Sequence, residues 1–280
     1  MSTTSHWFLL FGLSALLGGL VGSFLNVVSH RLPAGLSIVH PPSSCPHCKH
    51  PIRPWHNVPV VGWLTLRGQC RDCSEPISVR YPIVEFATAS LFALLFFHIV
   101  GGPSGIAEPS ALLVFLVYSF YFSALLAIGL IDADHFIVPD VISLPLVPLG
   151  ITAVALLETA GLSRLSGVTL PSAVLGALAG GGVMVALAAF GRLLFGREAL
   201  GMGDVKLVAA IGAWQGAHPA LLLTVFLGSL LGSVVGISSM LIRGRQRYAK
   251  LPFGPYLCAG ALVAWLWGDA LLARIASGLL

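Results

Sequence analysis

Two aspartates stand at the ends of apolar runs, where an ionisable side chain is costly. Asp204 lies in Gly201-Met-Gly-Asp-Val-Lys206, which leads directly into an apolar run, and Asp132 closes an earlier one. Ionisable groups at membrane depth usually face a protein interior or a wet cavity. If two such carboxylates converge, they share a proton, so one can take a proton from water while the other donates to a carbonyl oxygen. The pair predicts aspartyl-protease chemistry, and on physics alone a proton relay in a transporter is an equal alternative.

Three acids compete for the role of partner to Asp204. Asp132 is the closest of them to the end of its apolar run, and Asp134 is predicted to be a loop acid. Asp140 follows a proline and has the pattern of a helix N-cap. The competing interpretation is that the two aspartates only form ion pairs with nearby bases, Lys206 for Asp204 and His135 for Asp132.

The residues next to Asp204 are candidates for a supporting role in the site. Lys206 could lower the pKa of that acid or hold the pair in place, and a lysine that reaches to the membrane interface explains it equally well. Gly201 and Gly203 permit unusual backbone dihedrals and the close approach of another segment. We expect them to leave room for an extended substrate strand beside Asp204.

Four of the five cysteines form two CxxC pairs, Cys45/Cys48 and Cys70/Cys73. Each such pair supplies two thiolates from one tight turn, and zinc takes four thiolates tetrahedrally. The spacing predicts a structural zinc site, with two disulfides as the alternative. The polar stretch that holds the cysteines is too small to fold around a core of its own, which favours the metal.

The elements that must position these residues are membrane helices. The chain of 280 residues is 56% hydrophobic and 9% charged, whereas soluble domains are about 25% charged. The start of the chain lacks a basic signal-peptide region, so the first apolar run is predicted to be a retained span. We expect an all-α, polytopic bundle of eight spans, the sixth of them short for a full crossing. The apolar runs cover residues 7–28, 83–100, 111–131, 141–157, 173–195, 205–216, 220–242 and 252–272.

The distribution of basic residues predicts the orientation. The polar stretch 29–80, the end of the fifth run with its linker, and the loop 243–250 hold 12 of the 15 Lys and Arg residues. By the positive-inside rule these segments are cytoplasmic. An outside N-terminus and eight crossings then place the turns at Asp132 and Asp204 on the cytoplasmic side. A net charge of +4 so distributed reflects topology and does not indicate nucleic-acid binding. The 12 basic residues of the predicted cytoplasmic segments are Arg31, Lys49, Arg53, Arg67, Arg71, Arg80, Arg192, Arg197, Arg243, Arg245, Arg247 and Lys250.

One further acid, Glu85, enters the second span just after the cysteine-bearing stretch. A buried role near a substrate or a methyl donor and a simple helix-start acid favoured by the helix dipole are comparable interpretations.

Six ordered stretches give the chain a family resemblance. They are Gly22-Ser-Phe-Leu-Asn-Val-Val-Ser-His-Arg-Leu-Pro33, the two CxxC pairs, Tyr81-Pro-Ile-Val-Glu85, Ile131-Asp-Ala-Asp-His-Phe-Ile-Val-Pro-Asp140, Gly201-Met-Gly-Asp-Val-Lys206 and Pro252-Phe-Gly-Pro-Tyr256. With these motifs the chain resembles the type IV prepilin leader peptidases, polytopic aspartyl proteases of the GxGD class. It departs from their pattern in a slightly long linker between the acid motifs and in Val138, where leucine is usual.

The resemblance implies a function. Asp132 and Asp204 correspond to the catalytic acids of the family, and the cysteines belong to a cytoplasmic insert. The implied activity is removal of the basic leader of type IV prepilins or type II secretion pseudopilins, at the bacterial inner membrane. Members with the insert often also methylate the new N-terminus with S-adenosylmethionine. The alternatives are a peptidase without methyltransferase activity or a proton-coupled transporter. We divide the chain into a first transmembrane helix (1–29), a zinc-ribbon-like insert (30–81) and a peptidase core (82–280).

Overall fold

The structure is a computed structural model that describes residues 3–104, 108–196, 200–243 and 251–278, apart from the side chains of Arg164, Phe195 and Arg243. Of the basic residues used to predict the orientation, Arg197, Arg245, Arg247 and Lys250 lie outside the described residues. Residues 1–123 and 124–280 form two compact units, called unit 1 and unit 2. The division into 1–29, 30–81 and 82–280 stays a prediction.

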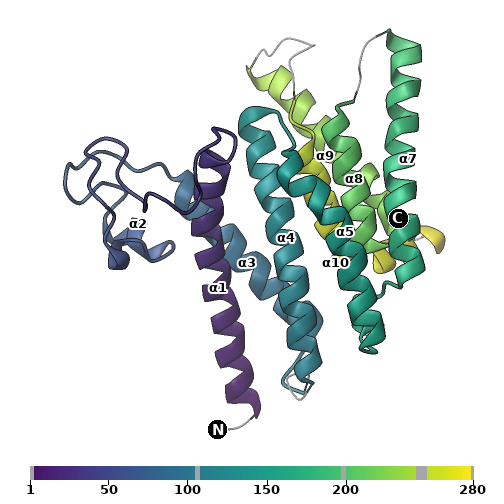
Figure 1. Ribbon diagram of the computed structural model, residues 1–280, viewed down its shortest axis with the longest axis horizontal. Helices are drawn as coiled ribbons and strands as arrows, with labels where there is room; N and C mark the ends of the chain where they lie inside the picture. The colour runs from purple at the N-terminus through teal and green to yellow at the C-terminus, as the bar shows by residue number, and fades with distance from the viewer. Residues whose placement is uncertain (1–2, 105–107, 197–199, 244–250, 279–280) are drawn as a thin grey trace. The chain divides into compact units, whose positions relative to one another are not determined.

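The described residues fold almost entirely into helices (Figure 1). Beyond them there are only isolated β-bridges, in the cysteine-bearing insert. The predicted all-α class is confirmed. The helices are α1 (Thr3–Arg31), the 3-10 helix η1 (Pro54–His56), α2 (Val61–Thr65), α3 (Arg80–Val100), α4 (Pro109–His135), α5 (Asp140–Thr159), α6 (Ser163–Ser166), α7 (Leu170–Phe195), α8 (Met202–Gln215), α9 (Pro219–Arg243) and α10 (Gly254–Ala276).

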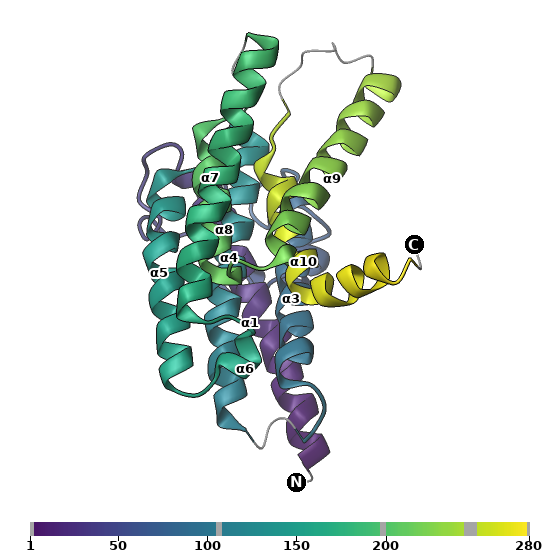
Figure 2. The same ribbon diagram turned by 90° about the vertical axis from the view of Figure 1, so that its right-hand side faces the viewer.

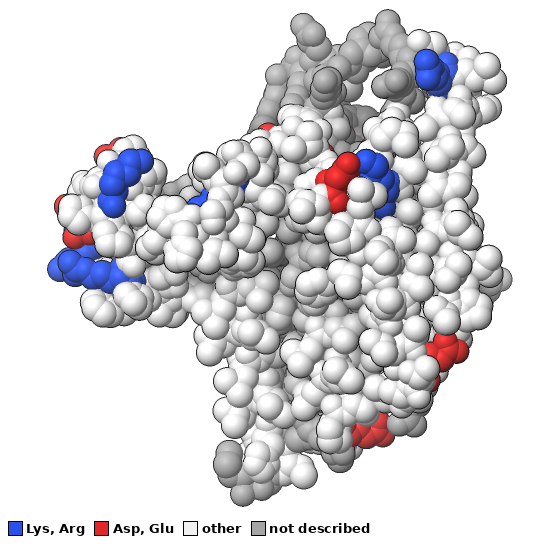
Figure 3. Space-filling view, in the orientation of Figure 1, with Lys and Arg blue, Asp and Glu red and all other residues white. Residues whose placement is uncertain are grey.

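Seven helices in the described part of the chain are long and apolar enough to cross a membrane, namely α1, α3, α4, α5, α7, α9 and α10. Their outer faces carry large apolar side chains, such as Leu193 at 84% and Leu241 at 81% exposure. Such faces suit lipid and would be a liability in water. The face seen in Figure 3 agrees, because charged side chains are sparse over its helices.

The predicted sixth span is α8, which has 14 residues and is not among these seven. At 1.5 Å per residue it rises about 21 Å, less than the ~30 Å of a bilayer core. It contacts α5, α7, α9 and α10 and is buried over most of its length. Because protein surrounds it, α8 does not need to match the thickness of the lipid. In Figure 2 the C-terminal ends of α7 and α9 lie at the same end of unit 2.

Close helix contacts depend on glycines that the sequence placed in the first and fifth spans. In unit 1, α1 packs on α3. A Cβ at Gly18 would lie 2.6 Å from the Thr88 carbonyl oxygen, and one at Gly22 would lie 2.8 Å from Cα of Glu85. In unit 2, Gly176 of α7 and Gly212 of α8 meet back to back, and a Cβ on either would clash with the other backbone. Small residues allow such approach in membrane bundles, so the packing interpretation of these stretches is confirmed.

The insert between α1 and α3 is built from two similar turns around the cysteine pairs. In the first, Cys45 N–H donates to the His50 carbonyl, and in the second, Cys70 N–H donates to the Glu75 carbonyl. The residue after each second cysteine, Lys49 or Ser74, has a left-handed φ near 60°. The bridges Ser44–Pro51 and Gln69–Pro76 close the two turns in the same way. The insert therefore contains a repeated knuckle, one copy for each CxxC pair.

Candidate active site

Asp132 lies in the last turn of α4, where its side chain is buried with 5% of the residue exposed. The backbone N–H of Gly254, at the start of α10, donates to Asp132 Oδ2 at 2.8 Å. A helix N-terminus suits a carboxylate because its free N–H groups and its dipole attract negative charge. A Cβ at Gly254 would lie 2.8 Å from the same oxygen, so only glycine permits this approach.

Gly254 is a site residue that sequence reasoning missed. It belongs to the Pro252–Tyr256 motif, which carried the resemblance without any role assigned to it. The signal that could have found it is a glycine at the start of a membrane helix, directly before a proline. Such a glycine exposes a free N–H where a carboxylate can reach it.

Asp204 lies in the first turn of α8 and is partly buried. The charge of Asp132 acts on the carboxylate of Asp204, so the two acids lie near each other within unit 2. Asp134, by contrast, is exposed. It lies in the last turn of α4 and not in a loop as predicted, because the helix continues to His135.

The two glycines of the GxGD motif behave differently from each other. A Cβ at Gly203 would lie 2.8 Å from Cβ of Val138, so the missing side chain lets the segment between α4 and α5 pass against α8. Close approach was therefore predicted correctly. The expected unusual dihedrals were wrong, since Gly201 has an ordinary φ of −75° and Gly203 is an ordinary helical residue. The expected space for an extended substrate strand stays a prediction.

Lys206 points to a partner other than Asp204. Its Nζ donates to both carboxylate oxygens of Asp140, at 2.8 and 2.9 Å. Pro139 is the N-cap of α5, so the interpretation of Asp140 as the cap was wrong: it is the first helical residue, and its carboxylate faces Lys206. The ion pair joins the first turn of α8 to the first turn of α5. It therefore fixes the helix that carries Asp204 to the loop that follows Asp132.

The other end of α8 is held by side chains that the sequence did not single out. Trp214 Nε1 donates to the Leu146 carbonyl of α5 at 2.8 Å, and the indole packs against Gly150. Gln215 Nε2 donates to the Ala261 carbonyl of α10 at 2.9 Å. Buried hydrogen bonds of this kind fix register along a helix. Together with the Lys206 ion pair they fix α8 against α5 and α10, and so fix the position of Asp204.

The four paired cysteines converge as the zinc prediction requires. Their sulfur atoms all lie within 4.8 Å of one another, with Cys45 Sγ 3.8 Å from Cys73 Sγ and Cys48 Sγ 4.0 Å from Cys70 Sγ. Tetrahedral zinc with Zn–S bonds near 2.3 Å separates its sulfurs by about 3.8 Å. A disulfide needs about 2.05 Å, so the geometry fits a four-thiolate metal site and not two disulfides.

The local backbone prepares one of these thiols for metal binding. Hydrogen bonds from the backbone N–H of Cys48 and then of His47 lower the pKa of Cys45 to about 6. Metals bind the thiolate, so a knuckle that stabilises the thiolate is suited to a cation.

Glu85 lies in α3, in unit 1, where it contacts the insert. Only 8% of the residue is exposed, and its Oε2 accepts a hydrogen bond from the Val60 N–H at 2.7 Å. The alternative of a plain helix-start acid, held only by the helix dipole, does not describe this contact.

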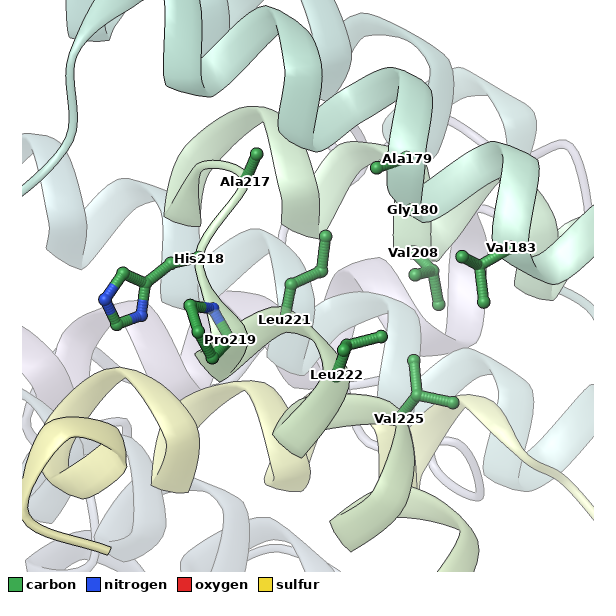
Figure 4. Close-up of a pocket in the computed structure, with 10 residues that line it drawn as sticks. All are labelled: Ala179, Gly180, Val183, Val208, Ala217, His218, Pro219, Leu221, Leu222 and Val225. Carbon is green, nitrogen blue, oxygen red and sulfur yellow. The ribbon is translucent and has the colours of Figure 1, made fainter. Parts of the chain in front are cut away.

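A separate apolar cavity of about 280 Å³ lies among α7, α8, α9 and the turn between the last two (Figure 4). Its walls are aliphatic apart from His218, whose Nε2 lies 3.7 Å from Asp269 Oδ1. None of the described residues that line it carries a carboxylate.

The fold and site together define a polytopic membrane protein with a paired-aspartate site and a four-cysteine insert. Comparison with known families agrees with this class in both parts of the chain. Residues 16–99 match the family described as Bacterial Peptidase A24 N-terminal domain, and residues 119–237 match the Type IV leader peptidase family.

Three relatives are named prepilin leader peptidase/N-methyltransferase. The protein of Pseudomonas aeruginosa is 39% identical, over 91% of this chain and 89% of its own length. That of Aeromonas hydrophila is 38% identical, over 94% and 92%, and that of Stutzerimonas stutzeri is 37% identical, over 92% and 90%. The chain belongs to the type IV prepilin leader peptidase family, Peptidase A24. No solved structure matches it.

Proposed function

We propose that the chain is a membrane endopeptidase that removes the leader of type IV prepilins or pseudopilins and then methylates the new N-terminus. The observation that carries the peptidase is that Asp132 and Asp204 lie near each other within unit 2. Near full-length similarity to relatives named for both activities supports the second step. None of the contacts described favours the transporter alternative.

The aspartates account for hydrolysis without a metal. One carboxylate takes a proton from water, whose oxygen attacks the scissile carbonyl carbon, while the other carboxyl donates its proton to the carbonyl oxygen. The tetrahedral carbon then releases the amine, which receives a proton as the carbon–nitrogen bond breaks. Gly254 and the Lys206–Asp140 pair act as positioning residues, because they hold the acids and the helices that carry them.

The location and orientation of the chain in the membrane decide where this reaction takes place. We place the chain in the bacterial inner membrane with Asp132 and Asp204 toward the cytoplasm, as the distribution of basic residues predicts. A prepilin substrate has a charged leader in the cytoplasm and an apolar helix in the lipid. Acids just inside the interface meet the scissile bond at that depth.

The insert and the methyl donor belong to the second activity. We assign structural zinc to Cys45, Cys48, Cys70 and Cys73 on the fit of the sulfur positions. S-adenosylmethionine, when bound, would supply an electrophilic methyl group to the deprotonated amine of the new N-terminus, with the neutral thioether as the leaving group.

The test uses purified full-length protein in detergent with a synthetic prepilin segment that contains the leader. Mass spectrometry of the product reports cleavage and methylation in the same sample. We expect cleavage at a leader glycine, followed by a gain of one methyl group. Cleavage without methylation would support the alternative of a peptidase alone, and neither reaction would refute the proposal.

A further inference from the structure

Unit 1 contains a cavity of about 660 Å³ between the insert and the adjoining ends of α1 and α3. Sites for small molecules commonly have volumes of about 300–1,000 Å³ and combine apolar walls with a few polar groups. The polar lining includes Ser23, Asn26, Arg31 and Glu85, and the aromatic lining includes Trp63 and Tyr81. The lining also includes the acids Asp72 and Glu75 and the bases Lys49, Arg53 and Arg71, and of its three acids only Glu85 is buried.

Glu85 is the buried charge of this cavity. Within the described residues its partners are the Val60 N–H and the hydroxyl of Ser23, neither of which carries charge. A buried carboxylate is costly unless a cation or enough hydrogen bonds compensate it. A positively charged ligand group would supply the missing compensation.

The segment that Glu85 contacts is strained. Val60 is a β-branched residue with φ 62° and ψ −50°, and the Val61 N–H donates to the Pro59 carbonyl at 2.6 Å. Such a three-residue turn with positive φ is rare and unfavourable for a side chain of this shape. Strain of this kind persists where the surroundings hold it, and it concentrates at functional sites. Here the Glu85 carboxylate holds the turn beside the cavity.

We propose that this cavity binds S-adenosylmethionine, with its sulfonium charge against Glu85. The ligand carries a carboxylate, an ammonium, a sulfonium and a purine ring. The cavity offers Arg31 for the carboxylate, Glu85 for positive charge and the faces of Trp63 and Tyr81 for the purine. This inference rests on the proposed methyltransferase function. It places the methyl donor in unit 1, within the segment matched by the N-terminal family.

The test compares S-adenosylmethionine with S-adenosylhomocysteine, which lacks the sulfonium methyl group and therefore has a neutral sulfur. Equilibrium dialysis of each radiolabelled compound against the purified full-length protein measures the affinities directly, without turnover. Glu85→Gln keeps an oxygen that accepts the Val60 N–H but removes the charge. We expect it to weaken S-adenosylmethionine at least tenfold and S-adenosylhomocysteine less than threefold. Retained S-adenosylhomocysteine binding also shows that the cavity of the variant is folded.

The matched control is Glu158→Gln. Glu158 is also a glutamate whose Oε2 accepts a backbone N–H, from Leu170 at 2.6 Å, and it lies in unit 2. This variant should bind both compounds as the wild type does. Equal weakening of both compounds by Glu85→Gln, or no weakening of either, would overturn the assignment of the sulfonium to Glu85.

Leader cleavage by the wild-type preparation separates this inference from the proposed function. Wild-type protein that cleaves and methylates a prepilin, while Glu85→Gln binds both compounds as the wild type does, would refute the cavity assignment alone. Protein that binds S-adenosylmethionine but does not cleave would refute the peptidase proposal and leave the cavity assignment standing.

Discussion

The insert and helix α8 stabilise their functional groups in opposite ways. Between residues 32 and 79 the one buried hydrophobic side chain is Cys45, while Trp55, Val58 and Leu64 are exposed. In α8, nine of 14 residues are buried, and side chains at both ends bond to neighbouring helices. The insert therefore depends on cross-linking by a metal, whereas α8 depends on burial.

The acids of the two units also differ in the surroundings that hold them. Asp132 and Asp204 are paired and sit at helix ends, where backbone and neighbouring helices define their positions. Glu85 is a single acid that holds a strained turn beside the cysteine insert. Two neighbouring acids suit proton sharing, whereas a single buried acid suits a cation. If the two units carry separate activities, a substitution in one unit should abolish the activity of that unit and leave the activity of the other unchanged.

The largest expected effect is on cleavage. Asp132→Asn and Asp204→Asn should each lower leader cleavage by about a thousandfold or more, because either change removes one of the two proton-transfer groups. Mass spectrometry of the prepilin product measures the rate. Binding of S-adenosylmethionine by the same variants should stay at the wild-type level. Normal processing by either variant would refute the acid pair.

The next effect concerns the metal. Cys45→Ser should remove most of the bound zinc, since three thiolates hold the ion less well and the insert has little core to replace it. Zinc content by elemental analysis is the measurement, with limited proteolysis to detect opening of the insert. Methylation should fall more than cleavage. Cys258→Ser, which changes a cysteine outside the cluster, is the control. Full zinc occupancy in Cys45→Ser would contradict the four-thiolate site.

A smaller effect follows from the contact between Gly254 and Asp132. Gly254→Ala places a Cβ only 2.8 Å from Asp132 Oδ2, which is too close, so the carboxylate must move. Loss of one well-placed donor commonly costs about a hundredfold in rate, and we expect a fall of roughly 10- to 100-fold in cleavage. Gly182→Ala in α7, where a Cβ would meet nothing within 4 Å, should cleave normally. Equal rates for both variants would remove Gly254 from the site.

The smallest effect belongs to the ion pair between α5 and α8. Lys206 and Asp140 are 30% and 57% exposed, and exposed pairs contribute at most about 1 kcal/mol. Lys206→Met and Asp140→Asn should therefore reduce cleavage only several-fold. The double variant should be no worse than the more severe single one, because both remove the same contact. A fully additive loss would show that Lys206 acts on Asp204 independently of Asp140.

Much of this protein could be predicted because its signals are local. A run of about 20 apolar residues forms a membrane helix whatever surrounds it, so the seven long helices fell close to their predicted positions. Each CxxC pair forms its knuckle within a few residues, so the four sulfurs could be anticipated as a cluster. Glycines in the first and fifth spans indicated close packing for the same local reason.

The details of the two sites required the tertiary structure. Lys206 is two residues from Asp204 in the chain but pairs with Asp140, because the start of α5 packs beside the start of α8. Glu85 contacts Val60 and Asp132 contacts Gly254 only because the chain returns to each place after a long excursion. The amino-acid sequence alone thus determined the helices, the cysteine cluster and which acids to consider. Which groups hold each acid was decided by packing, since hydrogen bonds and charge pairs depend on distances that residue numbers do not encode.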